Sequence, residues 1–593
     1  MIYFDYMKDL VKTSWNFKIF YKNDKDKQIE LDFNIFEKTV LNFEKKYKER
    51  KDYLNDGTKL LIACRDYEKL IGMSEGEKPL HYFFLRRDFD SNNKFVVAKV
   101  NEYTEKINKL INKIVFFKLK LGEIDKSLQD KFLNDSLLSK YHYFLKRIFN
   151  QAKYKLSEQE ERIINLLETP AHSMWTSGFS KLLNNQEIKW KGKNISINEA
   201  SGLISNLGAK DRRILANLIY KKLISISDFS ESELNAIITR KKMLDELRGY
   251  GKPYTETIEI YENEENVIEG LVASVTSNFK IAHRFYKLKA KLLKENKLSY
   301  ADRSAKIGDL KKNFSFDETI KIISSAFSKF DPKYEKIFKD YLNNGQIDVY
   351  PNKGKKGGAY CWGCYGSPTV VLLNHTNNFN SVMTLGHEMG HAFHTEMSYA
   401  QTPIYSNYTI SVAETASTLF ENFVFEEVFE TLSEKEKIIA LHDKINGSIA
   451  TVFRQIACFN FEKELHENIK KVGYLSKEEI AKMMNKHMKS YLGPVFNLKD
   501  EEGYFFVNWM HIRRFFYVYS YAFGSLISDA LYLEYKKDKN FKNKIEHFLS
   551  AGGSKSPEDI FADIGFDIRN PKFFENGLKV IEEDIKRLEK LVK

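Results

Sequence analysis

The sequence predicts a mainly α protein with one small β-sheet just ahead of a distinctive helix. Most of the chain is rich in Lys, Glu, Leu, Ile and Phe at helical spacing, as in EKINKLINKIVFFKLKLGEI, and few segments alternate as half-buried strands do. Residues 357–385 differ, because they combine glycines, turn residues and a β-branched run. With 593 residues, 43% of them hydrophobic, the chain can form several domains or one two-lobed body.

The first third of the chain predicts a lobe of its own. Residues 1–185 show successive amphipathic helical patterns without a catalytic constellation, so we assign them to an N-terminal helical lobe. Near residue 186, EIKWKGKNISINEA alternates apolar and polar residues across a Lys-Gly turn. This pattern predicts a small hairpin before helices resume at Ala200. We place the domain boundary here, with residues 186–593 as the second domain.

The next distinct element is the small sheet predicted from GGAYCWGCYGSPTVVLLNHTNNFNSVMTL. Its strand TVVLLN has an edge that could pair with an extended peptide, with Asn374 as a polar contact. An ordinary buried strand explains the same residues equally well.

The helix that follows this sheet carries LGHEMGHAFH. His387 and His391 are four residues apart, so both imidazoles leave one face of a helix and can meet one metal ion, with Glu388 beside them. Chance is a poor explanation, because roughly 0.04 such His-carboxylate-x-x-His patterns are expected in a chain of this composition. The spacing predicts a zinc site.

A third ligand is predicted from the scarcity of charge around this motif. Between Gly357 and Phe420 the only charged residues are Glu388, Glu396 and Glu414, although 29% of the whole chain is charged. Such a segment is interior, and interior charges have partners or metals. Glu414 lies in ISVAETASTLFEN, which has the spacing of a second helix, and it is the candidate third ligand.

Two imidazoles and one carboxylate would bind one zinc ion per chain and leave a fourth position open for water. A catalytic zinc lowers the pKa of that water to about 7 and stabilises an oxyanion. Glu388 would then be the general base that takes the water proton during attack on a peptide carbonyl and later passes it to the leaving amine.

Two neighbouring residues allow alternative interpretations. Glu421 lies seven residues after Glu414, on a similar helix face, and could accept the outer N–H of a metal-bound histidine; a solvent-exposed helix end is the alternative. His394 lies three residues after His391, and a core or supporting position is favoured over a role as a ligand.

A later segment, WMHIRRFFYVYSYAFG, gathers His511, Tyr517, Tyr519 and Tyr521. Tyrosine and histidine donors suit a developing oxyanion, whereas aromatic residues at this spacing also form ordinary core packing. The apolar stretch Phe515 to Ser528 is 14 residues long, too short to span a bilayer, and predicts a buried helix.

Composition argues against several classes of function. The net charge is +12, but 93 basic residues are interspersed with 81 acidic ones, which indicates a solvated surface rather than nucleic-acid binding. The N-terminus has no signal-peptide core and no segment is long enough for a membrane span, so we expect a cytoplasmic protein. The sequence carries no signal for an oligomeric state.

The four cysteines suit a reducing compartment. Cys361 and Cys364 match the redox dithiol spacing but lack the βαβ context of such motifs, and no second pair completes a four-thiolate zinc site. Structural or incidental thiols are favoured.

Taken together, GHEMGHAFH, AETASTLFEN and HIRRFFYVYSYA resemble the oligoendopeptidase F branch of the thimet-oligopeptidase-like zinc metallopeptidases. The resemblance extends over about residues 186–590 and includes SAGGSKSPEDIFADIGFDIRNPKFFENGL. The thermolysin-like enzymes are a poorer match, because the Asp that they place four residues after the third ligand is Thr418 here.

The resemblance implies a two-lobed helical body around a deep channel, and hence an endopeptidase for short, unstructured oligopeptides. It implies zinc ligation by the three residues already named, with Glu388 as the base. His511 with Tyr517 or Tyr519 would be the transition-state donors.

Two other functions remain open at this point. A zinc exopeptidase of the carboxypeptidase or dipeptidase type would use the same metal chemistry and would need an anchor for a chain terminus, for which Arg513 and Arg514 are the candidates. A catalytically silent peptide-binding protein is the second alternative, and the intact Glu388 argues against it.

Overall fold

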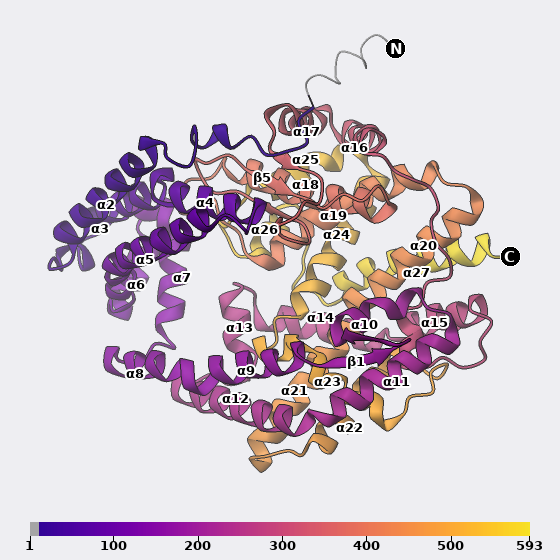
Figure 1. The fold of residues 1–593 in the computed structure, drawn as a ribbon. Coiled ribbons are helices and arrows are strands. Elements are labelled where there is room, and N and C mark those ends of the chain that lie inside the picture. The colour runs from indigo at the N-terminus through magenta and orange to yellow at the C-terminus, as the bar shows by residue number, and fades with distance from the viewer. Residues whose placement is uncertain (1–10) are drawn as a thin grey trace, which may run out of the picture. The chain divides into compact units, whose positions relative to one another are not determined.

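The structure, a computed structural model, describes residues 11–593 and confirms a mainly α protein (Figure 1). Its internal contacts divide the chain into two compact units, each built from three separate stretches. The first unit contains Met1–Lys153, Lys312–Thr431 and Glu534–Gly565, and the second contains Tyr154–Lys311, Leu432–Leu533 and Phe566–Lys593. The boundary predicted near residue 185 falls inside the second unit and stays a prediction.

The first unit holds the predicted metal-binding segment. Its helices and strands are α2 (Lys27–Tyr47), α3 (Gly57–Ile71), α4 (Ser74–Phe89), α5 (Lys94–Gly122), α6 (Lys126–Asn134), α7 (His142–Ala152), α16 (Phe316–Phe330), α17 (Pro332–Asn344), β3 (Ile347–Asp348), β4 (Tyr360–Trp362), β5 (Val370–Leu372), α18 (Phe379–Ser398), α19 (Ile410–Glu430), α25 (Lys542–Ser550) and α26 (Pro557–Asp563).

The second unit holds the segment with His511. Its helices and strands are α8 (Glu158–Glu168), α9 (Met174–Asn184), β1 (Glu187–Trp190), β2 (Lys193–Ser196), α10 (Ile197–Leu203), α11 (Ala209–Ser225), α12 (Ser227–Arg248), α13 (Thr255–Ile260), α14 (Glu265–Ser277), α15 (Lys280–Leu292), α20 (Glu434–Ser448), α21 (Gln455–Val472), α22 (Lys477–Leu492), α23 (Phe505–Asn508) and α27 (Lys572–Leu591). One more helix, α24 (Tyr519–Lys537), begins in the second unit and ends in the first.

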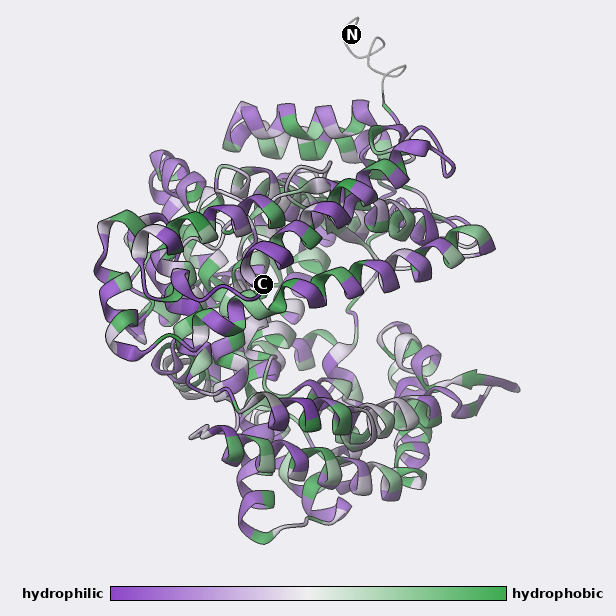
Figure 2. Ribbon diagram, turned by 90° about the vertical axis from the view of Figure 1, so that its left-hand side faces the viewer, coloured by the Kyte–Doolittle hydropathy of each residue, from purple (hydrophilic) through white to green (hydrophobic). Residues whose placement is uncertain are grey.

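The helices form where apolar residues recur with helical period and a polar side chain caps the first turn. In α2, Asp26 accepts a hydrogen bond from the N–H of Gln28, and Phe33, Phe36 and Val40 follow at helical spacing and are buried. Figure 2 shows the same division along many helices, with hydrophobic residues on one side and hydrophilic residues on the other. Burial of these apolar faces drives the packing within each unit.

A three-stranded sheet in the first unit lies against α18. The central strand β5 is fully buried and pairs with β3 in parallel and with β4 antiparallel, with Cys361 opposite Val371. The indole N–H of Trp15 donates to the carbonyl oxygen of Val371 over 2.9 Å, which ties the start of the described chain to the sheet. Strand β3 lies ahead of the segment predicted to form a sheet. The sequence did not predict this strand, because its two residues are too few to give an alternating pattern.

The hairpin predicted near residue 186 is present as β1 and β2. Lys191 and Gly192 at its turn have φ values of 47° and 84°, the left-handed conformation that a two-residue hairpin turn requires. The next helix, α10, begins at Ile197, three residues ahead of the expected position.

The buried helix predicted from Phe515 begins later, at Tyr519. Phe515 and Phe516 have φ values of 46° and 60°, which no right-handed helix accommodates, so these two residues form a turn instead. Across residues 11–593, none of the helices combines the length and the apolar character needed to cross a bilayer.

Candidate active site

The three predicted metal ligands lie together on two neighbouring helices of the first unit. His387 and His391 come from α18 and Glu414 from α19, and one ligand atom from each lies within 4.8 Å of the others. The Glu414 carboxylate oxygens are 3.7 Å from Nε2 of His387 and 4.0 Å from Nε2 of His391. Ligand atoms that share one tetrahedral zinc are about 3.4 Å apart, so the group has the size of a zinc site.

Two glycines on α18 allow α19 to come close enough to deliver Glu414. A Cβ atom added at Gly390 would lie 2.6 Å from Cα of Ser417 and 2.9 Å from the carbonyl oxygen of Ala416. One turn earlier, a Cβ at Gly386 would lie 2.8 Å from Val424. The glycines of the sequence GHEMGH therefore set the distance between the two helices, and with it the position of the third ligand.

Replacing Gly390 by Ala tests this close approach. We expect Gly390→Ala to push α19 away, to lower the free energy of unfolding by about 1–3 kcal/mol and to weaken zinc binding. Gly178 in α9 has no atom within 4 Å of an added Cβ, so Gly178→Ala is the matched control and should stabilise the protein by about 0.5–1 kcal/mol. Chemical denaturation and zinc titration measure both effects, and unchanged zinc affinity in Gly390→Ala would contradict the argument.

Glu421 orients the first histidine. Its Oε2 atom lies 3.0 Å from Nδ1 of His387, which is the first of the two interpretations that the sequence left open for Glu421. An ionised carboxylate only accepts, so Nδ1 carries a proton and Nε2 is left to face Glu414. Burial lowers the pKa of His387, but the hydrogen bond with Glu421 and the charges of the nearby carboxylates outweigh burial and raise it to about 9. The raised pKa means that the metal-free imidazole holds a second proton, at Nε2, and a cation bound at Nε2 would displace this second proton.

Burial shifts the pKa values of His391 and of Glu414, the candidate third ligand. Burial, together with the nearby charge of His387, lowers the pKa of His391 to about 3, so this imidazole is neutral and has a lone pair available at physiological pH. Burial raises the pKa of Glu414, and the charge of His387 opposes that rise. A partly buried carboxylate between two imidazoles gains from a cation that all three share.

Glu388 lies beside this group without belonging to it. The residue is 7% exposed, and the backbone N–H of Cys361 in β4 is near enough to favour its charged form. Burial and the charge of Glu414 raise the pKa of Glu388 to about 7, while the charge of His387 opposes them. A carboxyl group with a pKa near neutrality suits proton transfer in both directions.

The donor set of the group fits zinc. Two imidazole nitrogens and one carboxylate are a common ligand set for catalytic zinc, and three protein ligands leave room for a water. The facing Nε2 atoms, the neutral His391 and the acceptor at Glu421 are the features that such a site needs.

Two other polar residues of this region have separate roles. His394 is fully buried and stacks on Tyr408 with ring centroids 3.6 Å apart, so it is a core histidine. Glu396 accepts a hydrogen bond from the hydroxyl of Tyr341 over 2.7 Å. The interior charge that is not part of the candidate site therefore has a partner, as the charge pattern predicted.

The remaining predicted residues belong to the second unit. Nδ1 of His511 and the hydroxyl of Tyr517 form a short hydrogen bond, and Tyr521 packs beside both rings. Burial and a hydrogen bond with Tyr521 raise the pKa of Tyr517, so its hydroxyl keeps its proton and can donate. Tyr519 is fully buried, and its hydroxyl donates to Oδ1 of Asn263 over 3.0 Å.

A strained turn brings His511 and Tyr517 together. Phe515 and Phe516 adopt positive φ, and surrounding groups hold them there. The N–H of Phe516 donates to Glu462 over 2.8 Å, and the hydroxyl of Thr257 donates to the carbonyl oxygen of Phe515 over 3.0 Å. Helical spacing could not have predicted this pairing.

The two arginines proposed as anchors for a chain terminus differ in the structure. Arg513 is buried and its guanidinium donates to Glu233 over 2.7 Å, to the hydroxyl of Ser230 and to two backbone carbonyls. It is therefore committed within the fold. Arg514 is exposed.

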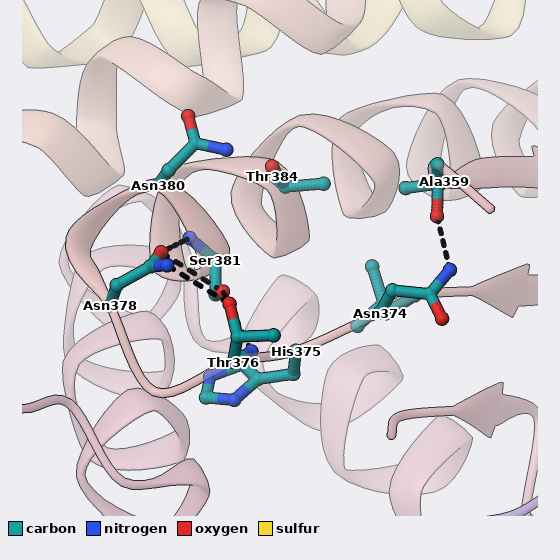
Figure 3. Close-up of a pocket in the computed structure, with 10 residues that line it drawn as sticks. Ala359, Asn374, His375, Thr376, Asn378, Asn380, Ser381 and Thr384 are labelled. Carbon is teal, nitrogen blue, oxygen red and sulfur yellow. Dashed lines mark hydrogen bonds between the residues drawn. The ribbon is translucent and has the colours of Figure 1, made fainter. Parts of the chain in front are cut away.

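A pocket of about 200 Å³ lies where β5 leads into α18 (Figure 3). Asn374 lines it, but its amide nitrogen donates to the carbonyl oxygens of Lys356 and Gly358 over 3.0 and 2.7 Å. The amide nitrogen thus holds the loop ahead of β4. The sequence suggested a contact with a bound peptide for Asn374 and did not predict this structural role.

Helix α18 contributes Asn380, Ser381 and Thr384 to the lining of the pocket. Asn380 and Thr384 lie in its lining, seven and three residues before His387. This spacing puts them on the same accessible face of α18 as the histidine. The pocket therefore begins within one helical turn of the first candidate metal ligand, His387.

Comparisons with known proteins find two matching sequence profiles and several relatives. The sequence profile of Peptidase family M3 matches residues 217–580, and the profile of Oligopeptidase F matches residues 120–185. Oligopeptidase PepF of Bacillus subtilis is 27% identical over 527 residues, which covers 86% of this chain and 78% of the relative. An oligoendopeptidase F homolog of Lactococcus lactis is 26% identical over 606 residues, covering 98% of this chain and 97% of the relative.

Solved structures show the same fold. A crystal structure from Chlamydophila abortus matches with a TM-score of 0.86 at 22% identity and covers 98% of both chains. Oligoendopeptidase-F from Enterococcus faecium matches with a TM-score of 0.68 at 19% identity and covers 95% of this chain and 99% of its own. The profile match spans more than half of the sequence and includes the three predicted metal ligands. The chain therefore belongs to peptidase family M3 and is a metalloendopeptidase.

Proposed function

We propose that the protein is a zinc-dependent endopeptidase that hydrolyses internal peptide bonds of short, unstructured oligopeptides. The observation that carries the proposal is the placement of His387, His391 and Glu414 within reach of one ion, with Glu388 buried beside them. A zinc ion held by these three residues would supply Lewis-acid activation of water and of the scissile carbonyl.

The proton transfers fall to Glu388. Its carboxyl group is buried next to the candidate ligands, where it can accept a proton from the attacking water. The same carboxyl group then returns the proton to the leaving amine, which makes departure of the amine possible. Glu421 keeps the imidazole of His387 in the orientation that ligation needs.

For the oxyanion, we propose His511 with Tyr517 as hydrogen-bond donors, and not Tyr519. The support is the resemblance of HIRRFFYVYSYA to the family motif together with the hydrogen bonds of the two tyrosines. Tyr517 is only partly buried and bonds to His511, whereas the hydroxyl of Tyr519 is buried and used by Asn263. Arg513 and Tyr519 thus resemble each other, because each uses its side-chain donors in hydrogen bonds within the second unit.

Removing the hydroxyl of Tyr517 or of Tyr519 tests which tyrosine is the oxyanion donor. We expect Tyr517→Phe to lower kcat by about 10²- to 10³-fold with little change in KM, because the donor acts on charge that develops only in the transition state. Tyr519→Phe should change thermal stability more than kcat. Steady-state kinetics with one fluorogenic peptide tests both variants, and a larger loss of kcat in Tyr519→Phe would reverse the assignment.

The pocket beside α18 is a candidate place for part of the bound peptide. Asn380 and Thr384 offer amide and hydroxyl groups on the helix face that carries the metal ligands. Such groups suit the polar backbone or side chains of an extended peptide.

The alternative function is a zinc exopeptidase with the same metal site, and blocked peptides distinguish the two. An endopeptidase should cleave an N-acetylated, C-amidated octapeptide at a rate within about a few fold of the free peptide, since neither terminus is recognised. An exopeptidase loses an ion pair at the blocked end and with it most of its activity. Because Arg513 is committed to Glu233, we expect cleavage of the blocked peptide; loss of activity after amidation alone would indicate a carboxypeptidase.

A further inference from the structure

A second group of possible metal ligands lies in the first unit, with no residue in common with the candidate active site. Glu77 and His81 come from α4, and Cys364 comes from the loop after β4. One ligand atom of each lies within 4.8 Å of the others, and Sγ of Cys364 is 3.9 Å from Nδ1 of His81. Cys364 is 283 residues from His81 in sequence, so its meeting with the two α4 residues is a property of the fold.

The local structure positions His81 and the loop of Cys364, and Glu77 is exposed on the same helix as His81. Glu77 and His81 are four residues apart and share one face of α4. The Trp362 ring packs on the imidazole of His81 with centroids 4.1 Å apart, which fixes its orientation. On the loop, Gly366 has a φ of 76°, and an added Cβ would lie 3.1 Å from Cβ of Ser74 at the start of α4. The loop and the helix are therefore in direct contact.

The chemistry of the three groups selects a class of ion. A thiolate, an imidazole and a carboxylate together suit zinc and similar divalent transition metals, whereas calcium and magnesium take oxygen ligands. One thiolate and one carboxylate would balance the charge of a divalent cation. Burial lowers the pKa of His81 to about 4, so its imidazole is neutral and can ligate. Burial raises the pKa of Cys364 to about 12, so without a cation this residue is a thiol.

We propose that Glu77, His81 and Cys364 form a second binding site for a divalent transition-metal ion such as zinc. On binding, the thiol of Cys364 gives its proton to solvent, the thiolate sulfur bonds to the metal, and a water completes the coordination. The ion would fasten the loop after β4 to α4. Because β4 packs against α18, the helix of Glu388, the second site would brace a strand next to the candidate active site.

Cobalt provides a direct test, since a thiolate ligand gives Co²⁺ a near-ultraviolet charge-transfer band that histidine and carboxylate ligands do not give. Cobalt chloride is titrated into the metal-free full-length protein while absorbance and bound cobalt are measured. We expect the wild type to bind two equivalents of cobalt. The thiolate band should appear as one of these two equivalents binds. Cys364→Ser and His81→Ala should lose the band and bind that equivalent at least about tenfold more weakly, while the other equivalent is retained and shows that the fold is intact.

Two further variants locate the thiolate. Cys361→Ser changes the neighbouring thiol of the same segment and should keep the band, and Glu414→Gln should keep it too, because the two sites share no ligand. The absence of a thiolate band from wild-type protein in excess cobalt would overturn the proposal. So would a band that survives in Cys364→Ser or disappears in Cys361→Ser.

Discussion

Glu388→Gln is expected to lower kcat/KM by about 10²- to 10⁴-fold while leaving zinc content unchanged. The amide has nearly the shape of the carboxyl group, but it cannot take a proton from water. Glu388 lies outside the ligand group, so its replacement should not release the metal.

Metal analysis and steady-state kinetics on the same preparation test this prediction. The measurement separates a base from a ligand, because a ligand variant loses metal and activity together. A Glu388→Gln protein that retains more than about a tenth of wild-type activity would contradict the assignment.

Glu414→Gln is expected to weaken zinc binding by more than about 100-fold and to abolish activity at trace zinc. Removal of a residue that only supports a metal ligand weakens binding by roughly 10- to 100-fold, and loss of a ligand itself should cost more. The neutral amide gives up the negative charge that lies 3.7 Å from Nε2 of His387 and 4.0 Å from Nε2 of His391. Competition with a chromophoric chelator measures the affinity.

Glu430→Gln is the matched control for this variant. Glu430 is exposed at the end of the same helix, α19, and lies outside the ligand group. It should bind zinc as the wild type does. Wild-type affinity in Glu414→Gln would show that the third ligand has been assigned to the wrong residue.

The meeting of the three candidate ligands could be predicted from sequence, because each step depended on local geometry or on composition. Helix periodicity places His387 and His391 on one face, and the scarcity of charge around them singles out Glu414. Glu421 followed from its spacing on the same helix, and the structure has it bonded to His387. The glycines that bring α19 close to α18 were visible in the motif, but their purpose depends on packing between helices.

Other features depend on backbone conformation or on contacts between distant segments. Because Phe515 and Phe516 have positive φ values, α24 begins only at Tyr519, and Tyr517 lies ahead of the helix. No periodic pattern in the sequence predicts these φ values. Arg513 looked like a free anchor in sequence because its partner Glu233 is 280 residues away. The cluster of Glu77, His81 and Cys364 was missed for the same reason.

The most direct test of the proposed function is mass spectrometry of unstructured peptides of graded length after incubation with the zinc-loaded wild type and with Glu388→Gln. We predict internal cuts in short peptides, a loss of cleavage as the peptides grow to the length of folded proteins, and none of these products with the variant. Stepwise trimming from one end, or equal products from both proteins, would contradict the account.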